Sequence, residues 1–252
     1  MNLLLCLLIA ATPAAPYKAD VTRLLGELKS KDPVRQDKAA RELAALGPRA
    51  VPALIEALKT DTEGVVGRAA RALGQIGPPA REAVPALIAR IDENKGRSRD
   101  DAEVIEALMR IAPRRNEVVP ALCAILREPS NNPCRIHAVV ALGKMGEDAK
   151  EAVSDLIKML EEEPSKTGPL RFHAATALGK IGSEAKRAVP ALVKLLNDKN
   201  AGPGRRTVVV ALGEMGPSAK SAVAALKEAQ SDPVLRDVTD KALAKIEGSS
   251  NP

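Results

Sequence analysis

Aromatic side chains are almost missing from this chain. Of its 252 residues, none is Trp, one is Tyr and one is Phe. Aromatic rings supply much of the buried area of ordinary globular cores, so this core has to consist of Ala, Leu, Val and Ile, which suits closely packed helices. Base stacking has few rings to work with, and binding to nucleic acid is therefore not expected.

Catalytic signatures are missing as well. The sequence holds no nucleophile motif, no glycine-rich phosphate loop and no cluster of Cys and His at metal-ligand spacing. We therefore expect no catalytic residues, no metal and no cofactor, which favours a protein that is not an enzyme. Neither sign of charge dominates, because 38 basic and 32 acidic residues are mixed along the chain and leave a formal net charge of +6. Such mixing is typical of a solvated helical surface.

Long apolar runs are also scarce. The apolar run at residues 3–11 (LLLCLLIAA) is shorter than the roughly 20 residues that span a bilayer. The small residues TPA follow it, which favours a secretory signal peptide, although no basic residue precedes the run. We predict a signal peptide at residues 1–15 and a mature domain at 16–252 without a membrane span. The protein is then exported to the periplasm or the extracellular space; the alternative is a buried first helix in a cytoplasmic protein.

Internal repetition is what the sequence has in abundance. The stretch ALGKIGSEAKRAVPALVKLL (177–196) nearly recurs as ALGKMGEDAKEAVSDLIKML (141–160) and ALGEMGPSAKSAVAALKEAQ (211–230). Aligned on the Leu of each ALG-like stretch, the column recurs at intervals of 30 to 36 residues: Leu43, Leu73, Leu108, Leu142, Leu178, Leu212 and Leu243. A second column, the Pro of VPAL, keeps the same step: Pro52, Pro85, Pro120 and Pro190. Two columns in step identify a repeat protein.

Each repeat contains two apolar patterns of helical spacing, as in REAVPALIARI (81–91) and RFHAATALGKIG (171–182). Strand patterns are absent. We therefore predict an all-α fold, an α-solenoid of about seven two-helix repeats whose stacking buries a continuous core. The predicted repeats are residues 20–47, 48–77, 78–112, 113–146, 147–182, 183–216 and 217–247.

Small residues indicate how the repeats pack. An Ala before each core Leu from Leu73 on, as at Ala177, is expected to let neighbouring backbones approach. The Gly of ALG costs about 1 kcal/mol relative to Ala in a helix, and close packing would offset that cost. The later Gly that closes each second helix, as at Gly182, is expected to adopt left-handed backbone as a C-cap. The Pro of VPAL is expected inside or near the start of the first helix, which it should bend.

These stretches, DPVR…AARELAALG, GRAARALGQIG…AVPALI, HAVVALGKMG…AVSDLI and HAATALGKIG…AVPALV, resemble HEAT repeats. They are most similar to the short bacterial subtype called PBS-lyase HEAT-like. The resemblance covers almost the whole predicted mature chain. It implies an α-solenoid whose second helices line the concave face, but no single function, because such solenoids serve many roles.

Four arginines share one column of the second helices: Arg135, Arg171, Arg205 and Arg236. In HEAT repeats a basic residue near this position pairs with acidic turn residues of neighbouring units. The turn Asp is present at Asp32, Asp61 and Asp232 and missing in the middle units. We predict a partial structural ladder, with an anion-binding row of guanidinium groups as the alternative.

The two histidines, His137 and His173, fall in one column of adjacent units. Packed helices hold them roughly 10 Å apart, too far to share a metal ion whose bonds are about 2 Å long, so we predict two surface histidines. No His-Glu pair is present, which argues against the iron site of HEAT-like deoxyhypusine hydroxylases. Cys123 and Cys134 fall in core columns and are expected to replace apolar residues there; a disulfide between them is the alternative in an exported protein.

Phe172 lies in a column that elsewhere holds Asp37, Gly67 and Asp237, so we predict that its ring is exposed. Around it we predict an apolar patch with a charged rim in units four to six, which suits a peptide or a partner helix. The predicted site consists of Phe172, Ile136, Val140, His137, His173, Thr176, Arg171, Arg205, Arg206, Lys144 and Lys180. The alternative is that these side chains merely pack between neighbouring hairpins.

Taken together, these patterns predict a non-catalytic, monomeric scaffold that binds a protein or peptide partner along its concave face. Two alternatives stay open. The subtype name implies a bilin lyase or a lyase-derived chaperone, although no residue is diagnostic of tetrapyrrole binding. The Arg column would instead support weak binding of anions or nucleic acid.

Overall fold

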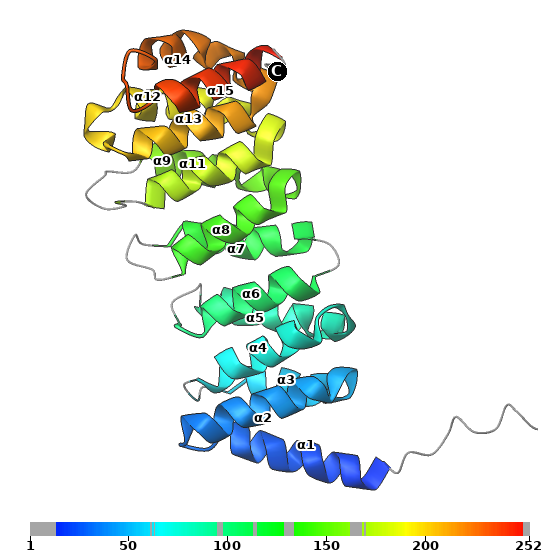
Figure 1. Cartoon of the computed structure of the whole chain (residues 1–252). Helices are drawn as coiled ribbons and strands as arrows, with labels where there is room; N and C mark the ends of the chain where they lie inside the picture. Colours follow the sequence, from blue (N-terminus) through cyan, green and yellow to red (C-terminus); the bar gives the residue numbers. More distant parts are fainter. Residues whose placement is uncertain are drawn as a thin grey trace, which may run out of the picture.

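The structure is a computed structural model that describes residues 14–60, 62, 64–94, 98–112, 115–128, 134–161, 168 and 170–248. Within these ranges the regular elements are α-helices and short 3-10 helices, and no strand is present. The described α-helices pair into seven consecutive hairpins, which stack in chain order from α1 at one end to α15 at the other (Figure 1). The predicted all-α solenoid is thus confirmed.

Each hairpin consists of a first helix and a second helix. The first helices are α1 (Ala14–Leu28), α3 (Val51–Leu58), α5 (Val84–Asn94), α7 (Val119–Leu126), α9 (Val153–Glu161), α12 (Val189–Asn197) and α14 (Val223–Ala229). The second helices are α2 (Pro33–Ala45), α4 (Val65–Ile76), α6 (Asp101–Ile111), α8 (Arg135–Met145), α11 (Leu170–Ile181), α13 (Gly204–Glu214) and α15 (Arg236–Glu247). Each second helix packs against the second helix of the next hairpin, so together they form one continuous face of the stack.

The junction between successive hairpins is a 3-10 turn that leads directly into the next first helix. In the second hairpin, η1 (Gly47–Ala50) ends where α3 begins, and Pro52 is one of the first two residues of that helix. Pro120 and Pro190 occupy the same place in α7 and α12. A missing N–H at this position breaks no helical hydrogen bond. Of the two expected positions, the one near the helix start is therefore confirmed: the Pro of VPAL is one of the first two residues of the first helix and does not lie in its interior.

The glycines that close the second helices have positive φ angles, as expected for a residue without a Cβ. Gly77 has φ 72° and ψ −146°, and Gly146 has φ 60° and ψ −134°. The extended ψ differs from the left-handed helical cap that the sequence predicts, and this region of backbone space is essentially restricted to glycine. The turn consequently leaves the helix axis sharply and directs the chain into the 3-10 segment.

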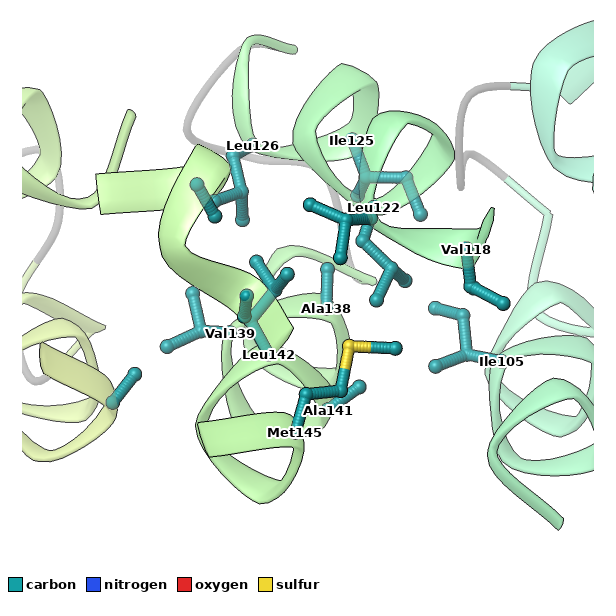
Figure 2. Close-up of a cluster of buried hydrophobic side chains, with 14 of the residues drawn as sticks. Ile105, Val118, Leu122, Ile125, Leu126, Ala138, Val139, Ala141, Leu142 and Met145 are labelled. Atoms are coloured by element: carbon teal, nitrogen blue, oxygen red, sulfur yellow. The ribbon is translucent and has the colours of Figure 1, made fainter. Parts of the chain in front are cut away.

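The core follows the Leu column from one end of the stack to the other. Leu43, Leu73, Leu108, Leu142, Leu178 and Leu212 are completely buried, and Leu243 in the last hairpin is 7% exposed. Figure 2 shows the fourth hairpin, where Leu122 and Ile125 of α7 and Leu142 of α8 point into a shared interior. Each buried Leu or Ile contributes about 1.5–3 kcal/mol, so an aliphatic core replaces the missing aromatic rings.

The interior glycines sit where neighbouring second helices touch. A Cβ added at Gly179 would lie only 2.7 Å from the Cα of Ala211, and one at Gly143 would lie 3.1 Å from the Cα of Ala177. Gly74 and Gly213 face Ala107 and Ala242 in the same way, at 3.2 and 2.9 Å. The predicted close approach of backbones through Ala and Gly is therefore present at these four junctions, and it accounts for glycine in the middle of a helix.

The predicted signal peptide lies almost wholly outside the described residues, which begin at residue 14. Helix α1 begins at Ala14, ahead of the predicted start of the first repeat at residue 20. Among the described helices, none combines the length and the apolar character that a membrane span requires.

Candidate functional site

A groove with a volume of about 670 Å³ opens on the face formed by the second helices α4, α6 and α8. We call it the central groove. Its apolar lining comes mainly from Ala102, Ile105 and Met109 of α6 and from Ile136 and Val140 of α8. Its polar lining consists of Arg71, Gln75, Glu103, Glu106, Arg110, His137 and Lys144. An apolar floor with charged edges is the usual lining of a site that binds a peptide or small molecule.

One residue explains why the groove opens between α6 and α8. The position after the core Leu is Gly74, Gly143, Gly179 and Gly213 at the four close junctions, but Met109 in α6. A Met side chain cannot fit where even a methyl group meets backbone, so α6 and α8 pack less closely than the other adjacent second helices. The partly buried Met109 side chain then lines the space that it creates.

The same rule accounts for a second, smaller groove of about 300 Å³ between α2 and α4. Here the glycine position holds Ala44, and α2 and α4 pack more closely than α6 and α8 but less closely than the helices joined through glycine. This groove is lined by Asp37, Ala40, Arg41, Arg71, Ala72 and Gln75. The size of one side chain per repeat therefore sets how far neighbouring second helices separate.

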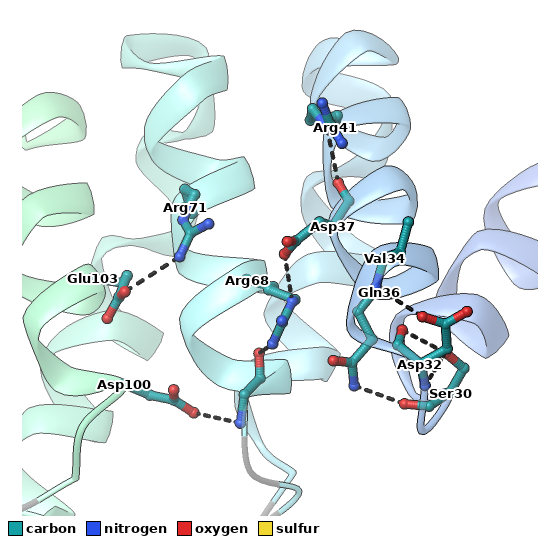
Figure 3. A network of polar contacts seen from close by, with 11 residues as sticks. Ser30, Asp32, Val34, Gln36, Asp37, Arg41, Arg68, Arg71, Asp100 and Glu103 are labelled. Carbon is teal, nitrogen blue, oxygen red and sulfur yellow. Dashed lines mark hydrogen bonds and ion pairs between the residues drawn. The ribbon is translucent and has the colours of Figure 1, made fainter.

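Ion pairs order two walls of the central groove. Arg71 Nη2 lies 3.3 Å from Glu103 Oε1, which joins α4 to α6 (Figure 3). Arg110 Nη2 lies 2.6 Å from Glu106 Oε1 within α6. In the neighbouring hairpins Arg68 Nε lies 2.7 Å from Asp37 Oδ1 and Gly64 N donates to Asp100 Oδ2 at 3.1 Å (Figure 3). Exposed pairs contribute little stability each, so these pairs add little to the stability of the stack.

The predicted site divides in two. Ile136, His137, Val140 and Lys144 all line the central groove, and Ile136 and Val140 are among the most exposed large apolar side chains of the described residues, at 38% and 39%. The other predicted members lie outside it, further along the stack on α11 and α13: Phe172, His173, Thr176, Arg171, Lys180, Arg205 and Arg206. The groove is thus formed by units two to four, and it contains the four predicted residues that lie on α8.

Phe172 corrects the expectation of an exposed anchor. Its ring is partly buried against the core and lies directly over Gly204, where a Cβ would overlap the ring atoms. The guanidinium of Arg171 covers the ring with its Cζ 5.0 Å from the ring centroid. Thr176 donates a hydrogen bond from Oγ1 to the Phe172 carbonyl at 3.0 Å. Phe172 therefore packs between hairpins, because glycine at the start of α13 leaves space for a large ring.

The Arg column is structural, as the ladder hypothesis predicts. Arg171 is 6% exposed and its Nη1 lies 3.4 Å from Asp198 Oδ2. Arg205 Nη1 lies 2.9 Å from Asp232 Oδ2, and its Nε donates to the Leu196 carbonyl at 2.8 Å. Arg135 is 1% exposed. The buried guanidinium groups of Arg135 and Arg171 are not available to an external anion, whereas Arg205 is partly exposed and Arg236 is exposed.

The remaining members of that ladder differ from the prediction. Asp198, which the sequence reading missed, is the partner of Arg171, and Asp32 instead caps α2 by accepting from Val34 N at 2.9 Å. Asp61 lies outside the described residues. Arg236 donates from Nε to the Gln230 carbonyl at 3.4 Å, and Arg206 donates from Nη1 to the Val234 carbonyl at 3.5 Å.

The third hairpin carries an acid in place of the buried arginine. Asp101 occupies the Arg column of α6 and is completely buried, and its Oδ1 has no hydrogen-bond partner within the described part of the chain. Its Oδ2 accepts from Ser98 N at 3.2 Å. Burial raises the pKa of Asp101 from 3.8 to about 6. Helix α6 therefore differs from α8, α11 and α13 at both positions, with Met109 in place of Gly and Asp101 in place of Arg, and it forms one wall of the central groove.

The two cysteines of the described chain are buried thiols rather than a disulfide. Burial raises the pKa of Cys123 and of Cys134 to about 11, so both are protonated at neutral pH and unreactive. Cys134 Sγ lies 3.5 Å from the Ser98 carbonyl. Among the described residues, no group of three or more His, Cys, Asp or Glu side chains is arranged to hold a metal ion.

Sequence reasoning missed Met109, Arg71, Glu103 and Arg110, all of which line the central groove. The signal was available for Met109, because ALG becomes ALM in the third repeat. A break in a packing column predicts a gap in the stack, whereas the search for exposed apolar residues pointed further along the chain.

The chain belongs to the family of HEAT repeats. The family model matches residues 21–109 and 153–245, which lie on either side of a stretch that contains α7 and α8. No curated protein matches the chain.

One solved structure shares the fold with a TM-score above 0.5. The crystal structure of a triple mutant of Kap121p aligns over 93% of this chain with a TM-score of 0.58 and 13% identity. This chain spans 30% of the length of that Kap121p structure. An engineered protein from a structural genomics consortium aligns over 91% of this chain and 97% of its own, with 24% identity and a TM-score of 0.40. A designed armadillo repeat protein aligns over 90% and 99%, with 19% identity and a TM-score of 0.38. At these identities the likeness concerns the fold alone.

Proposed function

We propose that this protein is a non-catalytic scaffold that binds an apolar segment of a partner protein in the central groove. HEAT and armadillo-like solenoids generally serve as protein-interaction scaffolds. The observation that carries the proposal is local: Met109 holds α6 and α8 apart, and Ile136 and Val140, both more than a third exposed, line the groove that opens there. Such side chains on a rigid face are a recognised mark of an interaction site.

The side chains around the groove favour recognition over catalysis. Its ionisable groups are Arg71, Glu103, Glu106, Arg110, His137 and Lys144. Both carboxylates are already held by arginines, at 3.3 and 2.6 Å. No nucleophile with an adjacent base lies among the lining residues, which supports binding as the activity of this face.

A selection with a matched pair of variants tests the proposal. Val140 on α8 and Val210 on α13 occupy the same position of their repeats and are 39% and 42% exposed, but only Val140 lines the groove. The full chain is immobilised and used to select a random peptide library displayed on phage. Selected peptides should contain aliphatic residues and should lose at least about tenfold in affinity on Val140→Glu, because a buried interface contact is replaced by a charge.

Val210→Glu serves as the control and should change affinity by less than about twofold, as an exposed substitution outside the contact does. Equal losses in the two variants would place the binding surface elsewhere on the second-helix face. Failure to enrich any peptide on the wild-type chain, with the chain folded by circular dichroism, would remove the proposed function.

A linear tetrapyrrole is the alternative occupant, following the resemblance to the PBS-lyase HEAT-like subtype. The groove volume of about 670 Å³ lies within the range of roughly 300–1,000 Å³ for small-molecule sites. Addition of biliverdin distinguishes the two: a shift in its absorption spectrum that disappears in Val140→Glu but persists in Val210→Glu would favour the bilin.

Export is proposed on sequence alone. The apolar run at residues 3–11 and the small residues after it support a cleaved signal peptide. N-terminal sequencing of the protein from its native host should begin between about residue 12 and about residue 17, from the spacing of such signals. Intact Met1 on cytosolic protein would instead identify a cytoplasmic scaffold.

A further inference from the structure

Three exposed basic side chains continue from the central groove along the second-helix face. They stand two positions after the core Leu in three successive repeats: Arg110 on α6, Lys144 on α8 and Lys180 on α11. The same position holds Gln75 on α4 and Glu214 on α13. We call these three residues the basic row. It ends at the neutral Gln75 on one side and at the acidic Glu214 on the other.

The stems of two of these side chains are packed on the helix in front. The Cδ atom of Lys180 lies 3.7 Å from where a Cβ would stand at Gly143, and the Cδ atom of Arg110 lies 3.5 Å from the same point at Gly74. The apolar stems therefore cover glycine backbone while the charged heads reach solvent. A side chain whose stem is already ordered loses less freedom when its head binds a ligand.

We propose that the basic row recognises carboxylates of an acidic, extended segment of the partner, whose apolar side chain occupies the central groove. This inference rests on the proposed function above and adds the chemistry of the partner. Arg110 and Lys144 belong to both features, because they line the groove. Lys180 is the next basic side chain along the stack and lies beyond the groove.

The spacing of the row predicts the spacing of the ligand. Packed helices lie about 8–10 Å apart, and an extended chain advances about 3.3 Å per residue. Every third residue of an extended segment that runs along the stack therefore meets a new helix. Carboxylates at i+3 and i+6 would face Lys144 and Lys180 across the close α8–α11 junction, and one at i would reach the long side chain of Arg110 across the wider α6–α8 junction.

The charges around the row favour an acidic ligand. Arg110 already pairs with Glu106 at 2.6 Å, but their side chains are 55% and 64% exposed. A pair so exposed is worth at most about 1 kcal/mol, so a ligand carboxylate can share or replace Glu106. The groove lining carries three Arg and Lys side chains against two Glu, and Lys180 adds a further positive charge at its edge.

Nucleic acid would offer negative charge too, but binding of its single-stranded form draws much of its affinity from aromatic surfaces on which the bases stack. The only Phe of the chain, Phe172, is partly buried over Gly204. A protein segment supplies both the carboxylates and the aliphatic side chain that an apolar groove accepts. The acidic peptide is therefore the occupant that these residues fit, and a polyanion is an outcome of the test.

The test uses three fluorescein-labelled peptides and the full chain. All contain one Leu in a Gly/Ser background. The first carries Glu at i, i+3 and i+6, the second carries the same three Glu in succession, and the third carries Lys at i, i+3 and i+6. By fluorescence anisotropy the spaced-Glu peptide should bind about tenfold more tightly than the Lys peptide and several-fold more tightly than the clustered one. Its affinity should fall as salt rises from about 50 to about 200 mM, because the heads of the row are exposed.

Lys245 supplies the matched control. It occupies the same position on α15, is exposed, and is separated from the row by Glu214. Lys180→Glu should weaken the spaced-Glu peptide by about three- to tenfold, as expected when an attractive rim charge becomes repulsive. Lys245→Glu should change its affinity by less than about twofold. Equal effects of the two variants would overturn the row.

Each further outcome decides between the two proposals. Equal affinity for the Glu and Lys peptides, with binding still lost in Val140→Glu, would overturn the acidic specificity while the proposed function stands. Absence of binding by all three peptides and of any peptide selected on phage would overturn both. Binding of an oligothymidylate as tightly as the spaced-Glu peptide, with the same loss in Lys180→Glu, would identify a general polyanion surface and overturn the acidic peptide.

Discussion

Two neighbouring junctions of the stack differ sharply although their repeats follow the same pattern. Between α8 and α11, Gly143 faces Ala177 so closely that a Cβ would lie 3.1 Å from the Ala177 Cα. Between α6 and α8, Met109 stands in the place of that glycine and Ala141 lines an open groove. The core Leu residues of the three helices, Leu108, Leu142 and Leu178, are all completely buried. The position after the core Leu, which we call the outer column, thus varies independently of the core Leu residues, which form the inner column.

This independence suggests how a repeat protein acquires a binding site without losing its core. The inner Leu column supplies the stability of each interface, and the outer Gly column sets the distance between second helices. Ile105 of α6 and Val118 and Met145 of the next hairpin are all buried in the hydrophobic core, so the interior stays apolar on both sides of this junction. One larger side chain on the outer column opens the surface and leaves the interior continuous.

The largest expected effect tests whether the inner Leu column contributes equally to stability at both junctions. Leu178→Ala and Leu108→Ala should each lower the free energy of unfolding by about 2–5 kcal/mol, because each leaves a cavity in a fully buried column. Lys180→Ala, two residues from Leu178 and exposed, should cost less than about 0.5 kcal/mol. Chemical denaturation measures all three. A Leu108→Ala cost as small as that of Lys180→Ala would mean that the open junction reaches into the core.

The next effect concerns Asp101. At the open junction this acid stands at the position where α11 and α13 carry Arg171 and Arg205. Its folded-state pKa of about 6 lies above 3.8, so the folded chain binds a proton more readily than the unfolded chain between these values. Stability should therefore fall as pH rises from about 4 to about 6, by up to about 3 kcal/mol, and stay lower above that range.

Asp101→Asn keeps the shape of the side chain and removes the titration. Denaturation of both proteins at a series of pH values checks the prediction, and the variant should be the more stable one at neutral pH. A flat difference between the two proteins across pH 4 to 7 would show that the carboxyl group keeps an ordinary pKa in the folded chain.

A smaller effect tests the close junctions. Gly179→Ala would gain about 1 kcal/mol from helix propensity alone, but its Cβ would lie 2.7 Å from the Ala211 Cα. We expect a net loss of about 1–3 kcal/mol from overpacking. Gly74→Ala, at 3.2 Å from Ala107 Cα, should lose less in the same thermal or chemical melt. Stabilisation by both substitutions would show that the glycines are not required for helix approach.

The smallest effect on stability is expected at Met109. Met109→Gly loses about 1 kcal/mol of helix propensity but lets α6 and α8 approach, so the net change should stay within about 1 kcal/mol. The groove should narrow, and peptides selected on the wild-type chain should no longer bind. Retention of their affinity in a folded Met109→Gly variant would show that the groove does not depend on this residue.

The sequence predicted the fold because the repeat columns are local and recurrent. The core Leu, the Ala before it and the closing Gly all have the roles that their spacing indicates, since each repeat packs in the same way on the next. The candidate site was predicted only in part: Ile136, His137, Val140 and Lys144 line the groove, whereas Phe172 packs over Gly204. An outward column in one helix says nothing about what the next hairpin places above it.

By itself, the sequence determined the repeat, the helical hairpins, the aliphatic core and the two columns that break at Asp101 and Met109. These follow from side-chain size and apolar spacing, which act within one or two helices. Only the tertiary structure decided which exposed apolar residues share a surface. It separated the α8 residues from Phe172 and joined them to Arg71 and Glu103, because the distance between second helices depends on contacts between repeats about 30 to 36 residues apart.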